Sequence, residues 1–166
     1  REQELILNSI KKYVIKLSLD VYGTHVIERV ISNFPYDLIE PITYTIAQNF
    51  LFLANNPNGL CIIKKIVVVE NKRKNHKIIQ KNIEDNALVL VQNPYGNYAL
   101  QTVLTYWNYE DCQGFINCFK KNFLLLSTQK YSSNVIEKCF ELDQTFLFEF
   151  INEVFYSENA LTLLLK

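Results

Sequence analysis

The sequence predicts an all-α fold, a curved α-solenoid in which helical repeats of about 36 residues stack on one another. Two observations support this prediction. Small residues recur at intervals of 36, 37 and 36 positions, at Gly23, Gly59, Gly96 and Ser132. Apolar residues follow each of them at offsets of 3, 4, 7 and 8, which is the spacing of a buried helix face.

An inner helix is predicted to begin near each small residue. Asp20, Asn56 and Asn93 can cap it by accepting hydrogen bonds from backbone N–H groups of the first turn. We expect the small residue because a bulky side chain there would hold the neighbouring repeat away. The buried faces predicted for the four inner helices are Val26, Ile27, Val30 and Ile31; Ile62, Ile63, Ile66 and Val67; Ala99, Leu100, Val103 and Leu104; and Val135, Ile136, Cys139 and Phe140.

An outer helix is predicted upstream of each inner helix, with a buried face marked by apolar residues at i and i+4. These pairs are Ile6 and Ile10, Ile42 and Ile46, Ile79 and Ile83, and Phe115 and Phe119. Polar loops connect the helices. The most charged of them, residues 70–77, is interpreted as a solvated loop, with a phosphate contact by its basic run, residues 72–77, as the alternative.

We treat residues 1–166 as a single solenoid fragment. Residues 1–12 are the outer helix of a preceding repeat, and 13–48, 49–85, 86–121 and 122–157 are repeats. Residues 158–166 are the start of a further repeat, and we expect both ends to be cut from a longer chain. Leu161 and Leu163–Leu165 would then be an apolar end, which predicts self-association or a further repeat.

Composition narrows the functional classes. Half the chain is apolar (49%), which excludes disorder, and 17 Lys and Arg balance 17 Asp and Glu. No apolar run approaches the roughly 20 residues of a membrane helix, so no membrane partner is expected. Four scattered cysteines and two histidines favour neither a zinc site nor a disulfide framework, and we expect reduced thiols, no metal, no cofactor and a cytoplasmic location. No motif in the sequence pairs a nucleophilic side chain with a general base, so the chain is not expected to be an enzyme.

The exposed face of each inner helix is predicted to carry a triplet at offsets +1, +2 and +5 from the small residue. In the third repeat, Asn97 and Gln101 offer paired amides beside the ring of Tyr98. A base edge presents a fixed pattern of donors and acceptors that such a triplet can read. The four triplets are Thr24, His25 and Glu28; Leu60, Cys61 and Lys64; Asn97, Tyr98 and Gln101; and Ser133, Asn134 and Glu137.

Two segments resemble the Pumilio, or PUF, family of RNA-binding repeat proteins. Residues 93–101 (NPYGNYALQ) resemble its uracil-reading repeat, and residues 132–139 (SSNVIEKC) resemble its penultimate, guanine-reading repeat. The resemblance implies single-stranded RNA as the partner, about one base per repeat, and repeats four to seven of eight. Thr24, His25 and Glu28 partly resemble a guanine reader, whereas Leu60, Cys61 and Lys64 match no usual triplet.

The resemblance also implies a role for each triplet residue. Base contacts are expected from Ser133, Glu137, Asn97, Gln101, Thr24, Glu28, Leu60 and Lys64, and stacking from Tyr98, Asn134, His25 and Cys61. The implied function is sequence-specific binding of a UGU-type element, in messenger RNA 3′ untranslated regions, to regulate translation or stability.

Protein partners enter the prediction in two ways. Other mRNA-regulatory proteins are expected alongside RNA. The alternative function is a helical-repeat scaffold that binds a protein or peptide on its concave face with little RNA affinity. Zero net charge favours this alternative, because phosphate neutralisation contributes much of RNA affinity. Lys64, Lys65, Arg29 and Lys138 lie on or beside the inner helices, however, and would make that face locally basic.

Overall fold

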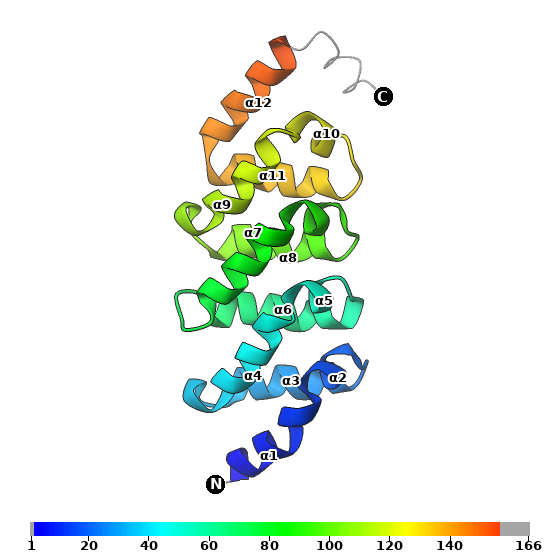
Figure 1. Ribbon diagram of the computed structural model, residues 1–166, viewed down its shortest axis with the longest axis vertical. Coiled ribbons are helices and arrows are strands. Elements are labelled where there is room, and N and C mark those ends of the chain that lie inside the picture. The colour runs from blue at the N-terminus through cyan, green and yellow to red at the C-terminus, as the bar shows by residue number, and fades with distance from the viewer. Residues whose placement is uncertain (1, 157–166) are drawn as a thin grey trace. The chain divides into compact units, whose positions relative to one another are not determined.

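The computed structural model describes residues 2–156 and contains, in that range, helices and turns with no strand. The chain divides into two compact units, residues 1–82 and 83–166, and the division falls inside α7 (His76–Gln92). The first unit contains α1 (Glu2–Ile10), η1 (Lys11–Tyr13), α2 (Val14–Leu19), α3 (Gly23–Asn33), α4 (Tyr36–Gln48), α5 (Phe50–Ala54) and α6 (Pro57–Val69) (Figure 1). The second contains α8 (Gly96–Tyr106), α9 (Tyr109–Lys120), α10 (Phe123–Ser127), α11 (Ser132–Leu142) and α12 (Gln144–Tyr156).

Each inner helix is preceded by a short helix that the two-helix prediction missed. These short helices are α2, α5, the C-terminal part of α7, and α10. A backbone break precedes each of them, at Tyr13, Asn49, Asn86 and Asn122, with φ between −130° and −108° and ψ between 6° and 24°. The sequence carries a signal for this break, because three of the four positions are Asn, a poor residue for a helix interior.

The predicted caps of the inner helices are confirmed. Asp20 Oδ1 accepts from the backbone N–H groups of Tyr22 (2.9 Å) and Gly23 (2.7 Å). The Asn56 side chain accepts from the backbone N–H groups of residues 58 and 59 at the start of α6. Asn93 Oδ1 accepts from the backbone N–H groups of residues 95 and 96 at the start of α8. Each cap satisfies donors that the helix itself cannot pair.

The small residue is required for a different reason from the one predicted. A Cβ atom on Gly23 would lie 2.6 Å from the carbonyl oxygen of Leu17, and one on Gly59 would lie 2.5 Å from that of Leu53. The close neighbour is therefore the short helix of the same repeat. Ser132 occupies this position in α11, and its hydroxyl donates to the carbonyl of Leu126 at 2.6 Å.

The buried faces of the helices agree with prediction except near the two ends, where Ile10 and Phe140, both predicted to be buried, are only half-buried. The inner-helix residues at offsets 3 and 4 of α6, α8 and α11 are at most 1% exposed, but Val26 in α3 is 44% exposed and was wrongly predicted to be buried. The offset-3 side chain of α6 lies in the first unit, where α6 packs on α3, whereas no inner helix precedes α3 among residues 2–156. Ile6 is likewise exposed, and Leu7 is the buried residue of α1.

The connection from α6 to α7 is an anchored loop. Lys72, Arg73 and Lys74 are exposed, as predicted for a solvated loop, but Glu70 and Asn75 are buried. The Glu70 carboxylate accepts from the Tyr36 hydroxyl (2.9 Å) and from the backbone N–H of Asn75 (3.1 Å). Burial of the phenol, together with its hydrogen bond to Glu70, raises the pKa of Tyr36 to about 12.

Two predictions fall outside this description. The apolar end at Leu161 and Leu163–Leu165 and the repeat start at 158–166 lie outside the described residues, and the repeat limits stay predictions. Within the described range, none of the helices has both the length and the apolar character needed to cross a bilayer.

Candidate nucleic-acid interface

The four predicted triplets lie at the N-terminal ends of α3, α6, α8 and α11. Within the first unit α3 packs on α6, and within the second α8 packs on α11. Each unit therefore brings two triplets onto neighbouring helices. The four residues predicted to stack against bases, His25, Cys61, Tyr98 and Asn134, are all exposed.

The residues at offset +1 were predicted to point away from the core, and three of the four do not. Thr24, Leu60 and Asn97 are only 6%, 8% and 1% exposed, whereas Ser133 is half-buried. The Thr24 hydroxyl donates to the carbonyl of Val21 (3.1 Å), which turns it back toward its own first turn. The prediction considered only the angle of each residue around the helix axis. Side chains also lean toward the helix N-terminus, and at offset +1 this brings them against the residues that cap the helix.

In α8, hydrogen bonds fix the orientation of the predicted amide pair. Asn97 Nδ2 donates to the carbonyl of Asn93 (2.8 Å), and Gln101 Nε2 donates to Asn97 Oδ1 (2.9 Å). The Gln101 amide keeps a carbonyl oxygen and a second N–H with which to meet a ligand. Tyr98, 48% exposed, lies beside this pair as a flat apolar surface with a polar tip.

In α11, the predicted triplet combines a hydroxyl with an exposed carboxylate. Ser133 is half-buried, and Asn134 and Glu137 are exposed. Lys138 follows on the same helix, with its ammonium 3.6 Å from the Glu141 carboxylate. Glu137 can accept two hydrogen bonds from one ligand edge, and Ser133 can add a third.

The two triplets of the first unit differ in chemistry. In α3, the His25 imidazole lies 3.9 Å from the Glu28 carboxylate, and both side chains are accessible. In α6, Leu60 is buried and apolar, so that it offers a base edge no hydrogen bond. The Cys61 thiol lies 3.7 Å from the carbonyl of Pro57, and Lys64 is the exposed cation. The α6 triplet therefore provides a charge and little readout chemistry.

Within each unit, the paired inner helices present polar and aromatic side chains at their N-terminal ends. In the part of the chain that the structure covers, no three His, Cys, Asp or Glu residues gather in a way that could hold a metal ion. The arrangement is suited to recognising an extended ligand, one repeat at a time. The fold and the site define an α-helical repeat protein.

The repeats identify the family. Residues 13–43, 86–117 and 122–145 match the Pumilio-family RNA binding repeat, and the chain belongs to this family. The matched segments leave out residues 44–85, which include the Leu60, Cys61 and Lys64 triplet.

Curated relatives agree with this assignment. The chain is 32% identical to the Pumilio domain-containing protein C6G9.14 of Schizosaccharomyces pombe over 134 residues, which are 81% of this chain and 20% of that protein. It is 34% identical to Pumilio homolog 12 of Arabidopsis thaliana over 150 residues, 86% of this chain and 24% of that protein. The chain thus spans about a quarter or less of the length of these relatives.

Solved structures share the fold. The Puf3 RNA binding domain bound to the Cox17 RNA 3′ UTR recognition sequence site A has a TM-score of 0.83 at 21% identity, covering 99% of this chain and 52% of that one. PUF-8 in complex with PBE-RNA has a TM-score of 0.75 at 25% identity, covering 85% of this chain and 41% of that one. The predicted fold class, an all-α solenoid of Pumilio-like repeats, is confirmed.

Proposed function

We propose that this chain binds single-stranded RNA and reads its bases with the inner helices. The observation that carries the proposal is the pair of successive triplets on α8 and α11, which pack together in the second unit. One triplet presents an oriented amide pair beside an exposed ring, and the other presents an exposed carboxylate beside a hydroxyl. Membership of the Pumilio family supports the same reading.

The two triplets have distinct base preferences in this proposal. Glu137 accepts from both donors on the Watson–Crick edge of guanine, and Ser133 adds a hydroxyl bond. Gln101, held by Asn97, pairs with a carbonyl and the N–H of uracil, while Tyr98 and Asn134 line the spaces between bases. The RNA runs antiparallel to the protein, as the family resemblance implies. The element read by α11 and α8 is then 5′-G-U, within a UGU-type sequence.

The first unit contributes less specificity. Leu60, Cys61 and Lys64 leave the base opposite α6 weakly specified, and Thr24, His25 and Glu28 favour a purine opposite α3. Phosphates are met by cations that flank the triplets, such as Arg29, Lys65 and Lys138. The chain has a net charge of zero, but these cations supply positive charge next to the triplets, where RNA phosphates would lie.

The biological role that follows is post-transcriptional regulation. We infer that the whole protein recognises messenger RNA 3′ untranslated regions in the cytoplasm, alters translation or stability, and catalyses no reaction itself. Other mRNA-regulatory proteins are its expected partners.

Titration of a fluorescent RNA tests the proposal. The 166-residue chain is titrated with a short RNA that contains UGU and, in parallel, with the same RNA carrying A, C or U in place of G. Tighter binding of the UGU RNA, by tenfold or more, is the expected result. Equal affinity for all four RNAs, or no binding, would instead favour the peptide-binding scaffold.

The guanine assignment has its own test in Glu137→Gln. The carboxylate that accepts twice becomes an amide that accepts and donates, so the preferred base at the G position should change. Ser133→Ala serves as a milder control. If Glu137→Gln weakens binding equally for G, A, U and C, Glu137 does not read a base.

A further inference from the structure

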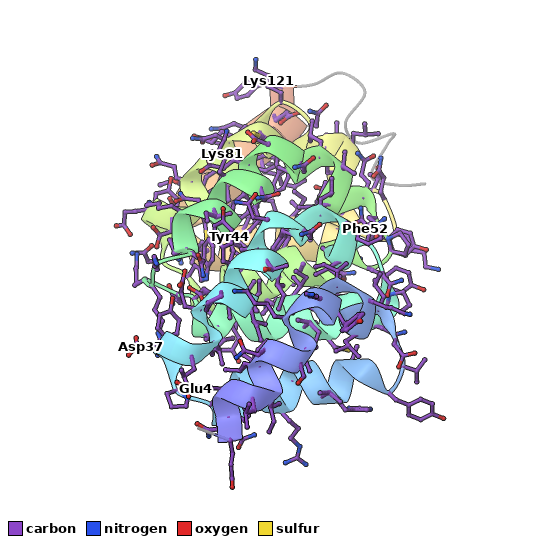
Figure 2. The ribbon with its side chains drawn as sticks, turned by 60° about the horizontal axis from the view of Figure 1, so that its bottom comes forward. Glu4, Asp37, Tyr44, Phe52, Lys81 and Lys121 are labelled. Atoms are coloured by element: carbon purple, nitrogen blue, oxygen red, sulfur yellow. The ribbon has the colours of Figure 1, made fainter. Side chains whose placement is uncertain are left out.

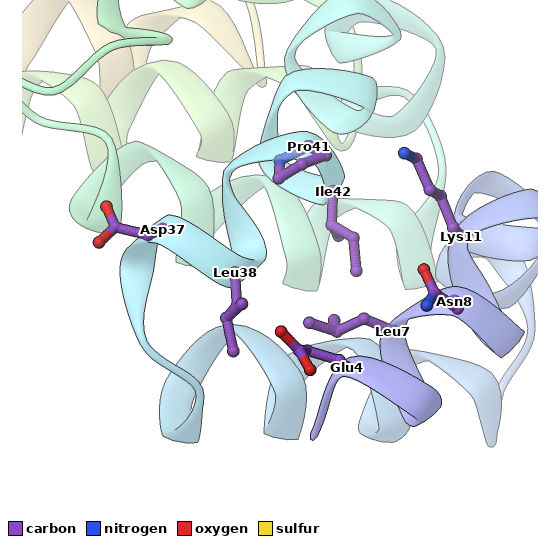
Figure 3. Close-up of a pocket in the computed structure, with 8 residues that line it drawn as sticks. All are labelled: Glu4, Leu7, Asn8, Lys11, Asp37, Leu38, Pro41 and Ile42. Atoms are coloured by element: carbon purple, nitrogen blue, oxygen red, sulfur yellow. The ribbon is translucent and has the colours of Figure 1, made fainter. Parts of the chain in front are cut away.

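A hollow lies between α1 and α4 of the first unit, formed by residues outside the predicted RNA-binding triplets. It encloses about 340 Å³, and Leu7, Leu38 and Ile42 converge on it to form an apolar floor (Figure 3). Glu4 and Lys11 stand at its rim, one near each end. The floor is built from two helices that pack on each other, so the hollow is part of the folded unit.

A second hollow continues the first along α4. It measures about 480 Å³ and is lined by Tyr44, Ile78 and Lys74, together with Lys11 and Pro41, which also line the first. The shared residues join the two into one groove. We call this groove the α4 groove.

Pro41 leaves one backbone carbonyl of α4 without its usual helical donor. Proline lacks an N–H, so residue 41 cannot donate to the carbonyl of Asp37, the partner that an α-helix would assign to it. Both residues line the first hollow. A bound chain can therefore satisfy this carbonyl with a backbone N–H.

The charges of the groove are separated along its length. Glu4 and Asp37, which lies in the first turn of α4, place two carboxylates at one end. Lys11, Lys74 and Glu40 line the second hollow, where the Lys74 ammonium lies 3.2 Å from the Glu40 carboxylate, so this end has an excess of one positive charge. Lys11 has no ion-pair partner among residues 2–156. Carboxylates at one end disfavour a phosphate backbone, and an apolar floor between opposite charges favours a peptide.

We propose that the α4 groove binds an extended peptide segment of a partner protein. The segment places an apolar side chain over Leu7, Leu38 and Ile42, with a basic residue toward Glu4 and an acidic residue toward Lys11. A backbone N–H of the peptide donates to the carbonyl of Asp37. The site is independent of the proposed RNA function, because it uses none of the triplet residues.

A defined peptide set tests the proposal on the 166-residue chain. Each fluorescein-labelled heptapeptide carries one Leu, one Lys and one Asp, in varied order and spacing, on a Gly and Ser background. We expect a subset with one order of charges to bind by fluorescence anisotropy, at least tenfold more tightly than versions with Leu replaced by Ser. No peptide binding above the Gly and Ser background overturns the proposal.

Variants locate the binding site. Leu38→Asp should reduce affinity at least tenfold, whereas Phe52→Asp, an equally polar change at an exposed residue away from the groove, should not (Figure 2). Lys11→Glu should weaken the best peptide and strengthen its charge-swapped counterpart, while Lys16→Glu should do neither. Circular dichroism melting verifies that each variant folds.

Pro41→Ala separates binding from folding. The new N–H can donate to the carbonyl of Asp37, so the helix should be at least as stable while peptide affinity falls several-fold. Unchanged affinity in both Pro41→Ala and Leu38→Asp overturns the proposal. So does competition between the peptide and the UGU RNA, which would assign the groove to RNA. A dimer that Leu38→Asp abolishes would assign it to a second copy of the chain.

Discussion

The helices α6 and α8 use the same framework for different surface chemistry. Both bury apolar residues at offsets 3, 4, 7 and 8, none of them more than 5% exposed. Their triplets differ, since α8 carries the Asn97 and Gln101 amide pair and α6 carries Leu60 and Lys64. The residues that form the core and the residues that form the triplet therefore lie at different offsets within one repeat. A helix can change its triplet without changing its buried face.

The two helices also end differently. The C-cap of α8 is Trp107, whose backbone N–H donates to the carbonyl of Val103. The C-cap of α6 is Glu70, whose buried carboxylate accepts hydrogen bonds from Tyr36 and Asn75. The connection from α6 to α7 is longer than the connection from α8 to α9. Side-chain hydrogen bonds hold the longer connection in place, whereas the shorter one is a simple turn.

The largest effect should come from the shared framework. Ile63→Ala in α6 and Leu100→Ala in α8 should each cost about 2–5 kcal/mol of unfolding free energy, because both side chains are fully buried. Urea unfolding measures the loss. A loss below about 0.5 kcal/mol in both variants would mean that the inner-helix register is wrong.

The next effect should be confined to the end of α6. Tyr36→Phe removes a hydrogen bond to a buried carboxylate and should cost about 1.5–3 kcal/mol. The raised pKa of Tyr36, about 12 against 10.0, means that the folded state holds the phenol proton more tightly. The stability that Tyr36 contributes through this raised pKa is fully present below pH 10 and is lost as the pH rises through 12. Thermal melts of both proteins should therefore converge as the pH rises from 9 to 12.

A smaller effect should distinguish the stacking positions. Tyr98→Ala should weaken binding of every RNA by about 1–3 kcal/mol, the usual contribution of one stacked base. Cys61→Ala removes no ring and should change affinity by less than about 0.5 kcal/mol. Anisotropy titrations with one RNA compare them directly. Equal losses in the two variants would show that α6 and α8 contact RNA alike.

The smallest effect should concern charge alone. Lys64→Ala should weaken all RNAs to the same extent and reduce the slope of log K against log salt by about 0.7, the value for one phosphate contact with a single strand. Gln101→Ala should leave that slope unchanged and alter base preference instead. A change in base preference with Lys64→Ala would mean that α6 reads a base after all.

The sequence by itself determined the repeat, the caps and most of the core. Capping depends on a side chain and a backbone separated by two or three residues, as at Asp20 and Gly23, and the buried stripe depends on helix periodicity. The family resemblance also arose from contiguous residues, such as 93–101. Local rules therefore sufficed for these features.

Only the tertiary structure decided the remainder. The periodic stripe made Val26 equivalent to Ile62, yet burial at this offset requires a preceding inner helix, and α3 has none among residues 2–156. The short helices were missed because five or six residues are too few to show a period, and Asn97 was misplaced because its amide turns back to Asn93. The α4 groove joins residues more than 30 positions apart. Burial and grooves depend on which elements meet in space, and a single repeat read in isolation does not contain that information.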